Sequence, residues 1–291
     1  MQKKIFLSYQ PIRTFTIAIL LFFAVIQTKG MSFQQHNTIR IATYNIQYDN
    51  KADTLNSWGK RKKMVSKLIQ QYHLDLVGIQ EPQLHQLDDL KNLLPGYQLI
   101  GTGDKGSVPI LYSTEKLRQL DEGVIWLSST PEIRSIGWDA SMPRKFRWIH
   151  FEDLKTKKKF YLFNIHLDHL GTIARQEGIK VLLAHIPTIS KGEPFVITGD
   201  FNSDQYSVVY QTVVAAGSIQ DTRTIAARLI HPLWTTWNGY QTPPIPRKEQ
   251  KRIDHIFVSK GSTIHRWELI NKNYNKFYPS DHFPVFIDYE L

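Results

Sequence analysis

Short apolar runs alternate with amphipathic stretches along the chain, and this alternation predicts a mixed α/β fold. Apolar residues three and four positions apart mark the buried face of a helix, whereas short β-branched runs are typical of buried strands. Expected strands cover Ile39–Asn45, Leu76–Gln80, Tyr97–Gly101, Val108–Ser113, Gly123–Leu127, Phe146–Asp153, Lys159–His166, Phe195–Thr198, Arg252–Val258, Ile264–Ile270 and Phe283–Tyr289. Expected helices cover Arg61–Tyr72, Gln83–Leu94, Thr172–Ile186 and Ser207–Ala216.

Strands interleaved with helices in this way predict a layered α/β sandwich, with two sheets face to face and helices on both flanks. The sequence contains no internal repeat and no low-complexity linker, and its 291 residues can form one large core. We therefore expect residues 31–291 to form one domain. The most irregular segment, Gln241–Lys251, is expected to be an exposed loop.

The first 30 residues differ from the rest. Basic residues precede an apolar run from Phe15 to Ile26, no acid occurs in this part, and Thr28 and Gly30 suit cleavage before Met31. This pattern predicts a signal peptide over residues 1–30. An N-terminal membrane anchor is the alternative, although the apolar run is short for a full span. The prediction is a monomer exported to the periplasm or the extracellular space, without stable membrane association once the leader is cleaved.

The formal net charge is +10, and the chain has no cysteine. Four of the basic residues, Lys3, Lys4, Arg13 and Lys29, lie in the predicted leader, which leaves +6 for residues 31–291. A basic surface favours anionic partners such as nucleic acids and phosphoesters, but an ordinary cationic surface explains the charge equally well. The absence of cysteine excludes disulfides and a lipoprotein anchor.

Polar residues of metal-binding or acid–base type end, follow or precede several of the predicted strands. Each one alone is explained by a turn or a cap. Together they are harder to dismiss, because strand ends on one side of a sheet can converge on a single pocket. These residues are Asn45, Glu81, Asn164, His166, Asp168, Asp200, Asn202, Asp254, Asp281 and His282.

The chemistry available to this set is the cleavage of a phosphoester bond. Asn45, Glu81 and Asp281 supply the oxygen ligands that Mg²⁺ prefers, whereas a zinc site would need more histidine or cysteine. Asp200 could orient or deprotonate a water, with Asn202 fixing its geometry. His166 and His282 could donate hydrogen bonds to phosphate oxygens. Asp254 could keep His282 in its cationic form.

Six motifs occur in the order found in the endonuclease/exonuclease/phosphatase superfamily, which the chain resembles from Ile39 to Leu291. They are "TYNIQ", "GIQEP", "NIHLDHLG", "TGDFN", "RIDHIFV" and "SDHFPV". The stretch from Gly123 to Trp148 resembles the secreted bacterial branch. The resemblance implies a four-layered α/β sandwich of two mixed β-sheets and phosphoester hydrolysis with a divalent metal, Mg²⁺ or Mn²⁺.

The resemblance also implies roles for individual residues. Glu81 matches the principal metal carboxylate, Asn45 the amide beside it, and Asp281 the acid next to the terminal histidine. Among the catalytic positions, Asp200 and Asn202 match the pair that positions water, His166 a phosphate contact, His282 the terminal histidine, and Asp254 its partner.

We therefore expect an exported metal-dependent phosphoesterase acting on phosphodiesters or phosphomonoesters, with nucleic acid as one candidate substrate. The alternative is a catalytically silent relative that binds a phosphorylated or glycan ligand. Arg144 is expected to bind substrate, although a surface ion pair explains it equally well. Asp168 is a second substrate-binding candidate, and the alternative for it is to secure the turn at Gly171.

Overall fold

A computed structural model of the protein describes residues 37–241 and 251–291, together with Met1. The predicted signal peptide and most of the expected loop Gln241–Lys251 lie outside the described residues, and both stay predictions. Within the described ranges, no helix combines the length and the apolar character needed to cross a membrane.

Two mixed β-sheets form the centre of the fold. The first contains β1 (Thr38–Asn45), β2 (Leu76–Gln80), β3 (Tyr97–Ile100), β4 (Ile110–Ser113), β10 (Leu229–Ile230), β12 (Thr263–Leu269) and β13 (Val285–Glu290). The second contains β5 (Leu117–Trp126), β6 (Lys145–Asp153), β7 (Lys159–His166), β8 (Phe195–Asp200), β9 (Ile219–Asp221) and β11 (Asp254–Ser259). Their strand orders are β10-β12-β13-β1-β2-β4-β3 and β5-β6-β7-β8-β11-β9.

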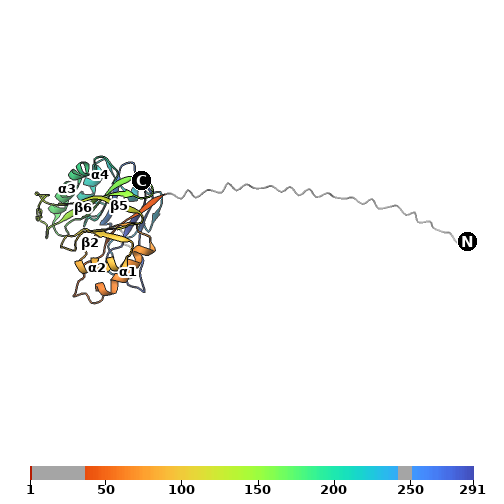
Figure 1. The fold of residues 1–291 in the computed structure, drawn as a ribbon. Coiled ribbons are helices and arrows are strands. Elements are labelled where there is room, and N and C mark those ends of the chain that lie inside the picture. The colour runs from red at the N-terminus through yellow and green to blue at the C-terminus, as the bar shows by residue number, and fades with distance from the viewer. Residues whose placement is uncertain (2–36, 242–250) are drawn as a thin grey trace. The chain divides into compact units, whose positions relative to one another are not determined.

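Helices cover the outer faces of both sheets (Figure 1). Helices α1 (Trp58–Gln71) and α2 (Leu84–Leu93) pack their apolar faces on β1 and β2. Helices α3 (Thr172–Ser190) and α4 (Val208–Ala215) cover the second sheet, and α5 (Thr222–Ile225) is a single short turn. A third apolar cluster fills the space between the sheets. The predicted four-layered sandwich is therefore confirmed.

Three short elements, β9, β10 and α5, escaped the sequence-based prediction, because two to four residues show no periodicity. Strand β5 also begins at Leu117 rather than at the expected Gly123. It is the edge strand of its sheet and pairs only with β6, so most of its first residues are polar or exposed. The pattern of apolar residues therefore could not predict that these residues belong to a strand.

A buried amide joins the two sheets. The Asn164 side chain on β7 has no exposed surface, and its Nδ2 donates to the backbone carbonyls of Ile79 at 2.9 Å and Pro109 at 3.0 Å. Its Oδ1 accepts from Gln80 Nε2 at 2.7 Å and from Thr198 Oγ1 at 3.2 Å. Gly78 allows this approach, since a Cβ there would lie 2.5 Å from Asn164 Oδ1.

Replacing Asn164 with leucine should therefore lower the free energy of unfolding by about 3 kcal/mol, because it leaves several buried polar groups without partners. Chemical denaturation measures the change. The exposed Asn92→Leu on α2 is the control and should stay within about 0.5 kcal/mol of the parent. A loss below about 1 kcal/mol for Asn164→Leu would contradict this account of the sheet contact.

Candidate active site

Strand direction brings the predicted polar residues to one edge of the two sheets. Strands β1 and β2 run parallel, as do β7 and β8, so their carboxyl ends point the same way. Strands β13 and β11 run antiparallel to β1 and β8, so their amino ends meet that edge. In the register, His166 and Asp254 both lie opposite Asp200.

Asp200 is at the centre of the site and is 1% exposed. Its Oδ2 accepts from Asn45 Nδ2 at 2.9 Å, and its Oδ1 accepts from the backbone N–H of Asn202 at 2.9 Å. Burial, together with the negative charge of Asp254, raises the pKa of Asp200 to about 7. Asp200 can therefore exchange a proton near neutral pH.

His282 is paired with Asp254 inside the site. The distance from His282 Nδ1 to Asp254 Oδ2 is 2.9 Å, and His282 Nε2 lies 3.9 Å from Asp200 Oδ2. Burial lowers the pKa of His282, but the Asp254 and Asp200 carboxylates outweigh burial and hold that pKa well above its ordinary value. The imidazole is therefore protonated at neutral pH, with Nε2 as a donor on the side of Asp200.

The His166 ring differs from the His282 ring in its charge. Burial and the positive charges of Arg144 and His282 hold its pKa well below the ordinary range, so the ring is neutral. Its Nε2 lies 3.1 Å from Asn202 Nδ2, which assigns the proton to Nδ1. Among the described residues Nδ1 has no hydrogen-bond partner, although it is buried. A buried polar atom of this kind is suited to meeting a substrate oxygen.

Glu81 follows β2 in a left-handed backbone conformation with φ of 64°. Gln47 and Asn202, which follow β1 and β8, share this conformation with φ of 55° and 46°. Left-handed conformations are costly for residues other than glycine and cluster at functional sites. Here each one turns the chain sharply at a strand end, so that the neighbouring polar side chains face the site.

The acidic groups fit a hard divalent cation. Ligand atoms of Glu81, His166 and Asp200 lie within 4.8 Å of one another, as do those of Asp200, Asp254 and His282. Burial raises the pKa of Asp281, and the nearby charge of Glu81 raises it further. Carboxylates crowded in a buried site repel one another, and a bound cation with oxygen ligands relieves that repulsion.

The expected ligand set of Asn45, Glu81 and Asp281 is only partly gathered around one point. Asp281 lies in neither carboxylate–histidine group. Its Oδ2 accepts from Gln47 Nε2 at 3.4 Å. Asn45 turns its amide nitrogen toward Asp200, and its Oδ1 accepts from the Gln47 N–H at 2.9 Å. Glu81 and Asp200 therefore form the innermost oxygen pair, with Asn45 and Asp281 beside them.

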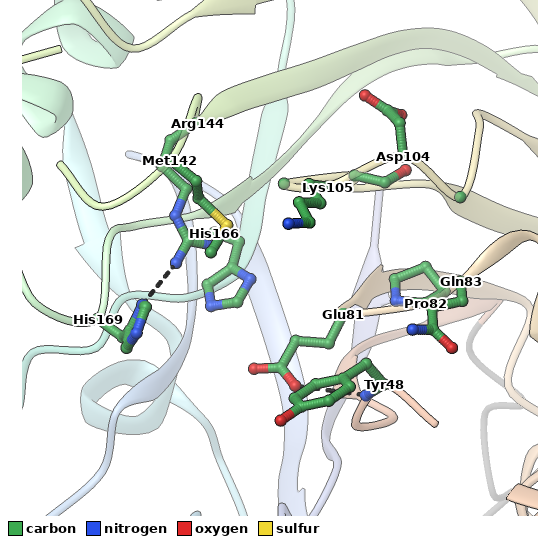
Figure 2. Close-up of a pocket in the computed structure, with 13 residues that line it drawn as sticks. Tyr48, Glu81, Pro82, Gln83, Asp104, Lys105, Met142, Arg144, His166 and His169 are labelled. Atoms are coloured by element: carbon green, nitrogen blue, oxygen red, sulfur yellow. Dashed lines mark hydrogen bonds between the residues drawn. The ribbon is translucent and has the colours of Figure 1, made fainter. Parts of the chain in front are cut away.

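A pocket of about 530 Å³ opens next to Glu81 and His166. Figure 2 shows these two side chains facing one another, with Tyr48 beside Glu81 and Lys105 next to Asp104. The pocket is lined by Tyr48, Glu81, Pro82, Gln83, Gly103, Asp104, Lys105, Gly106, Ser107, Met142, Arg144, His166 and His169.

The loop Gly103–Ser107 forms one wall and is closely fitted to its surroundings. A Cβ on Gly103 would lie 2.1 Å from the backbone nitrogen of Leu84, and one on Gly106 would lie 2.3 Å from the Pro143 carbonyl oxygen. Asp104 is held by Lys145, whose Nζ lies 2.8 Å from Asp104 Oδ2. The sequence signal for this wall, "TGDKGS", resembles an ordinary turn, so Lys105 was missed. Tyr48, which follows β1, was missed as well.

Arg144 lines the pocket and is buried against Asp168, with Nε 3.1 Å from Asp168 Oδ2. It is therefore not a surface ion pair. Asp168 also accepts from Ser141 Oγ and from the backbone N–H groups of Leu170 and Gly171. Burial raises its pKa, but these hydrogen bonds outweigh burial and hold that pKa well below its usual range. Asp168 secures the turn and Arg144, so we reassign it from substrate contact to positioning residue.

Comparisons with known proteins agree with this geometry. A sequence profile of the Endonuclease/Exonuclease/phosphatase family matches residues 42–282. The structure is similar to a mannosyl-6-phosphatase of Bacteroides thetaiotaomicron VPI-5482, with 34% identity, a TM-score of 0.82, and coverage of 87% of this chain and 100% of that one.

Two further relatives extend the comparison. An endonuclease/exonuclease/phosphatase from Bacteroides vulgatus shares 33% identity and a TM-score of 0.81 over 87% of this chain and 99% of its own. An uncharacterized protein of Acanthamoeba polyphaga mimivirus is 25% identical over 80% of this chain and 92% of its own length.

The two histidines of the site should differ in protonation. In the chelated protein at pH 7, ¹⁵N NMR should report an imidazolium for His282, because Asp254 holds its charge, and a neutral ring for His166, because that ring is buried beside other cations. Asp254→Asn should move the His282 pKa back toward the ordinary value. Two rings titrating together near pH 6.5 would contradict the assignment.

Proposed function

Because the chain belongs to the endonuclease/exonuclease/phosphatase family, whose members hydrolyse phosphoester bonds, we propose that it is an exported, divalent-metal-dependent phosphomonoesterase acting on small sugar phosphates. The observation that carries the proposal is the convergence of Glu81, Asp200 and His166, of which Glu81 and His166 line one pocket. The apolar run within residues 1–30 supports export.

Glu81 and Asp200 would hold the cation, with Asn45 and Asp281 beside them. A bound Mg²⁺ or Mn²⁺ would supply positive charge to the phosphoryl oxygens as negative charge builds on them. Asp200 has a second role that follows from its own environment. Without a cation, burial raises the pKa of Asp200 to about 7, whereas a bound cation would favour the charged carboxylate, which can accept a hydrogen bond from an attacking water and orient it. The Asn45 amide and the Asn202 N–H hold its two oxygens in place.

The two histidines meet the phosphoryl group with different charges. His282 is cationic and presents Nε2 on the side of Asp200, so it can stabilise developing charge or protonate a leaving oxygen. His166 is neutral and can donate from Nδ1 without adding charge. Asn202 acts on His166 by fixing its tautomer.

The pocket favours a compact leaving group. Segments around Tyr48, Pro82, Lys105, Met142 and His169 enclose it, whereas a nucleic-acid strand needs an extended basic groove. Aromatic and apolar side chains with a few polar groups suit a sugar ring, whose hydroxyls Gln83, Asp104 and Lys105 could contact. The similarity to a mannosyl-6-phosphatase supports this choice of substrate.

Turnover should depend on the cation and on the converging side chains. With mannose 6-phosphate or p-nitrophenyl phosphate, Mg²⁺ or Mn²⁺ should support phosphate release, and chelation should abolish it. Glu81→Gln and His282→Ala should each reduce kcat/KM at least about 100-fold, since each removes charge stabilisation. The exposed Glu115→Gln is the matched control and should leave it unchanged. Turnover that resists chelation would contradict the proposal, and inactivity across a phosphoester panel would favour a binding protein.

Replacing Lys105 should show whether its side chain binds the sugar or the phosphate of the substrate. Lys105→Ala should raise KM for mannose 6-phosphate about tenfold, because a charged hydrogen bond to the sugar is lost, while kinetics with p-nitrophenyl phosphate stay nearly unchanged. Lys91→Ala, on the exposed face of α2, is the control. An equal rise in KM for both substrates would place Lys105 on the phosphate instead.

A further inference from the structure

Two buried residues outside the pocket, Arg61 and Gln86, contact the loops from which the cation-binding groups extend. We infer that Arg61 and Gln86 are positioning residues that set the geometry and affinity of the cation site by joining these loops. The inference rests on the proposed function only in taking a divalent cation as the ligand of that site.

Arg61, on the first turn of α1, is 1% exposed and binds backbone carbonyls from three segments. Its Nη1 donates to the carbonyls of Ile46 at 2.6 Å and Pro279 at 3.0 Å. Its Nη2 donates to Gln47 at 3.1 Å and its Nε to Asn56 at 2.6 Å. Four of the five guanidinium donors are thus used. Arg61 thereby joins the loop after Asn45 to the segment that leads to Asp281.

Gln86, in the first turn of α2, has no exposed surface and extends the same connection to Glu81. Its Nε2 donates to the Gln47 carbonyl at 2.9 Å. Its Oε1 accepts from the backbone N–H of Gln83 at 2.9 Å and from that of Asp49 at 3.2 Å. Gln86 therefore fixes the loop after β1 against the loop that carries Glu81.

Both side chains meet at Gln47, which touches two residues of the cation site directly. The Gln47 carbonyl accepts from Arg61 and from Gln86. Its backbone N–H donates to Asn45 Oδ1, and its side chain donates to Asp281 Oδ2. Since Gln47 is held with φ of 55°, relaxation of this loop would displace both neighbouring ligand groups.

The chemistry of Arg61 suits positioning rather than simple packing. Among the described residues it forms no ion pair with a carboxylate; its charge is met by carbonyl dipoles and by the face of Trp58, whose ring centre lies 5.4 Å away. Burying a charge in this way is costly, and an apolar side chain would fill the same space at lower cost. Only the planar fork of arginine reaches carbonyls in several directions, and lysine cannot reproduce it.

The test is cation affinity measured without substrate. Isothermal titration with Mn²⁺ should give a Kd raised about 10- to 100-fold in Arg61→Lys and in Gln86→Met, as expected when groups that orient ligands are lost. At a fixed Mn²⁺ concentration, the rise in Tm over the chelated protein should shrink accordingly. In assays, saturating Mn²⁺ should restore most of kcat. The double variant should fall short of the product of the single effects, because both side chains bind one carbonyl.

The matched control is Arg40→Lys. Arg40 also donates to a backbone carbonyl, that of Tyr72 at 2.7 Å, but it lies at the other end of β1. Its Kd for Mn²⁺ should match the parent. The inference is wrong if a folded Arg61→Lys or Gln86→Met variant has a lower Tm in chelator but binds Mn²⁺ with the Kd of the parent. If Arg61→Lys does not fold, Gln86→Met decides alone. A parent protein that binds no Mn²⁺ would instead refute the proposed function.

Discussion

The site depends first on the fixed contact between the two sheets. Asn45 and Glu81 extend from strands of the first sheet, whereas His166 and Asp200 extend from the second. Neither sheet alone contains a complete site, so the distances between the site residues depend on how the two sheets pack together. The buried Asn164 amide fixes that packing by binding the carbonyls of Ile79 on β2 and of Pro109, which precedes β4. A polar contact of this kind is directional, whereas apolar packing alone permits sliding.

Several carboxylates lie close together in the site, and each has a different set of partners. Asp254 is neutralised by His282, and Asp168 by Arg144 and backbone donors. Asp200 is left buried with a raised pKa, and Glu81 faces the pocket. Asp254 and Asp168 are thus paired with cations and hold the framework, while Asp200 and Glu81, which form no ion pair with arginine or lysine among the described residues, remain available for a cation and a substrate.

The sequence predicted most of the fold and the position of the site because both follow from repeated local patterns. Buried strands such as β2 and β7 were placed correctly to the residue, and Asp200 and His282 stand beside apolar runs. For Asp168 the sequence left open whether it binds substrate or secures the turn at Gly171, because its partners Ser141 and Arg144 are distant along the chain. Lys105 and Gln86 were missed for the same reason. Their importance comes from what the fold places beside them, which no local pattern records.

The wall formed by Gly103–Ser107 shapes the pocket without forming part of the group around Asp200. It connects β3, the edge strand of its sheet, to β4, and its contacts are made with Leu84, Pro143 and Lys145 rather than with the reacting groups. Gly103 and Gly106 leave no room for side chains where this loop meets the rest of the fold, whereas Lys105 between them is exposed. A change at Lys105 can therefore alter which molecules the pocket accepts without moving the groups around Asp200.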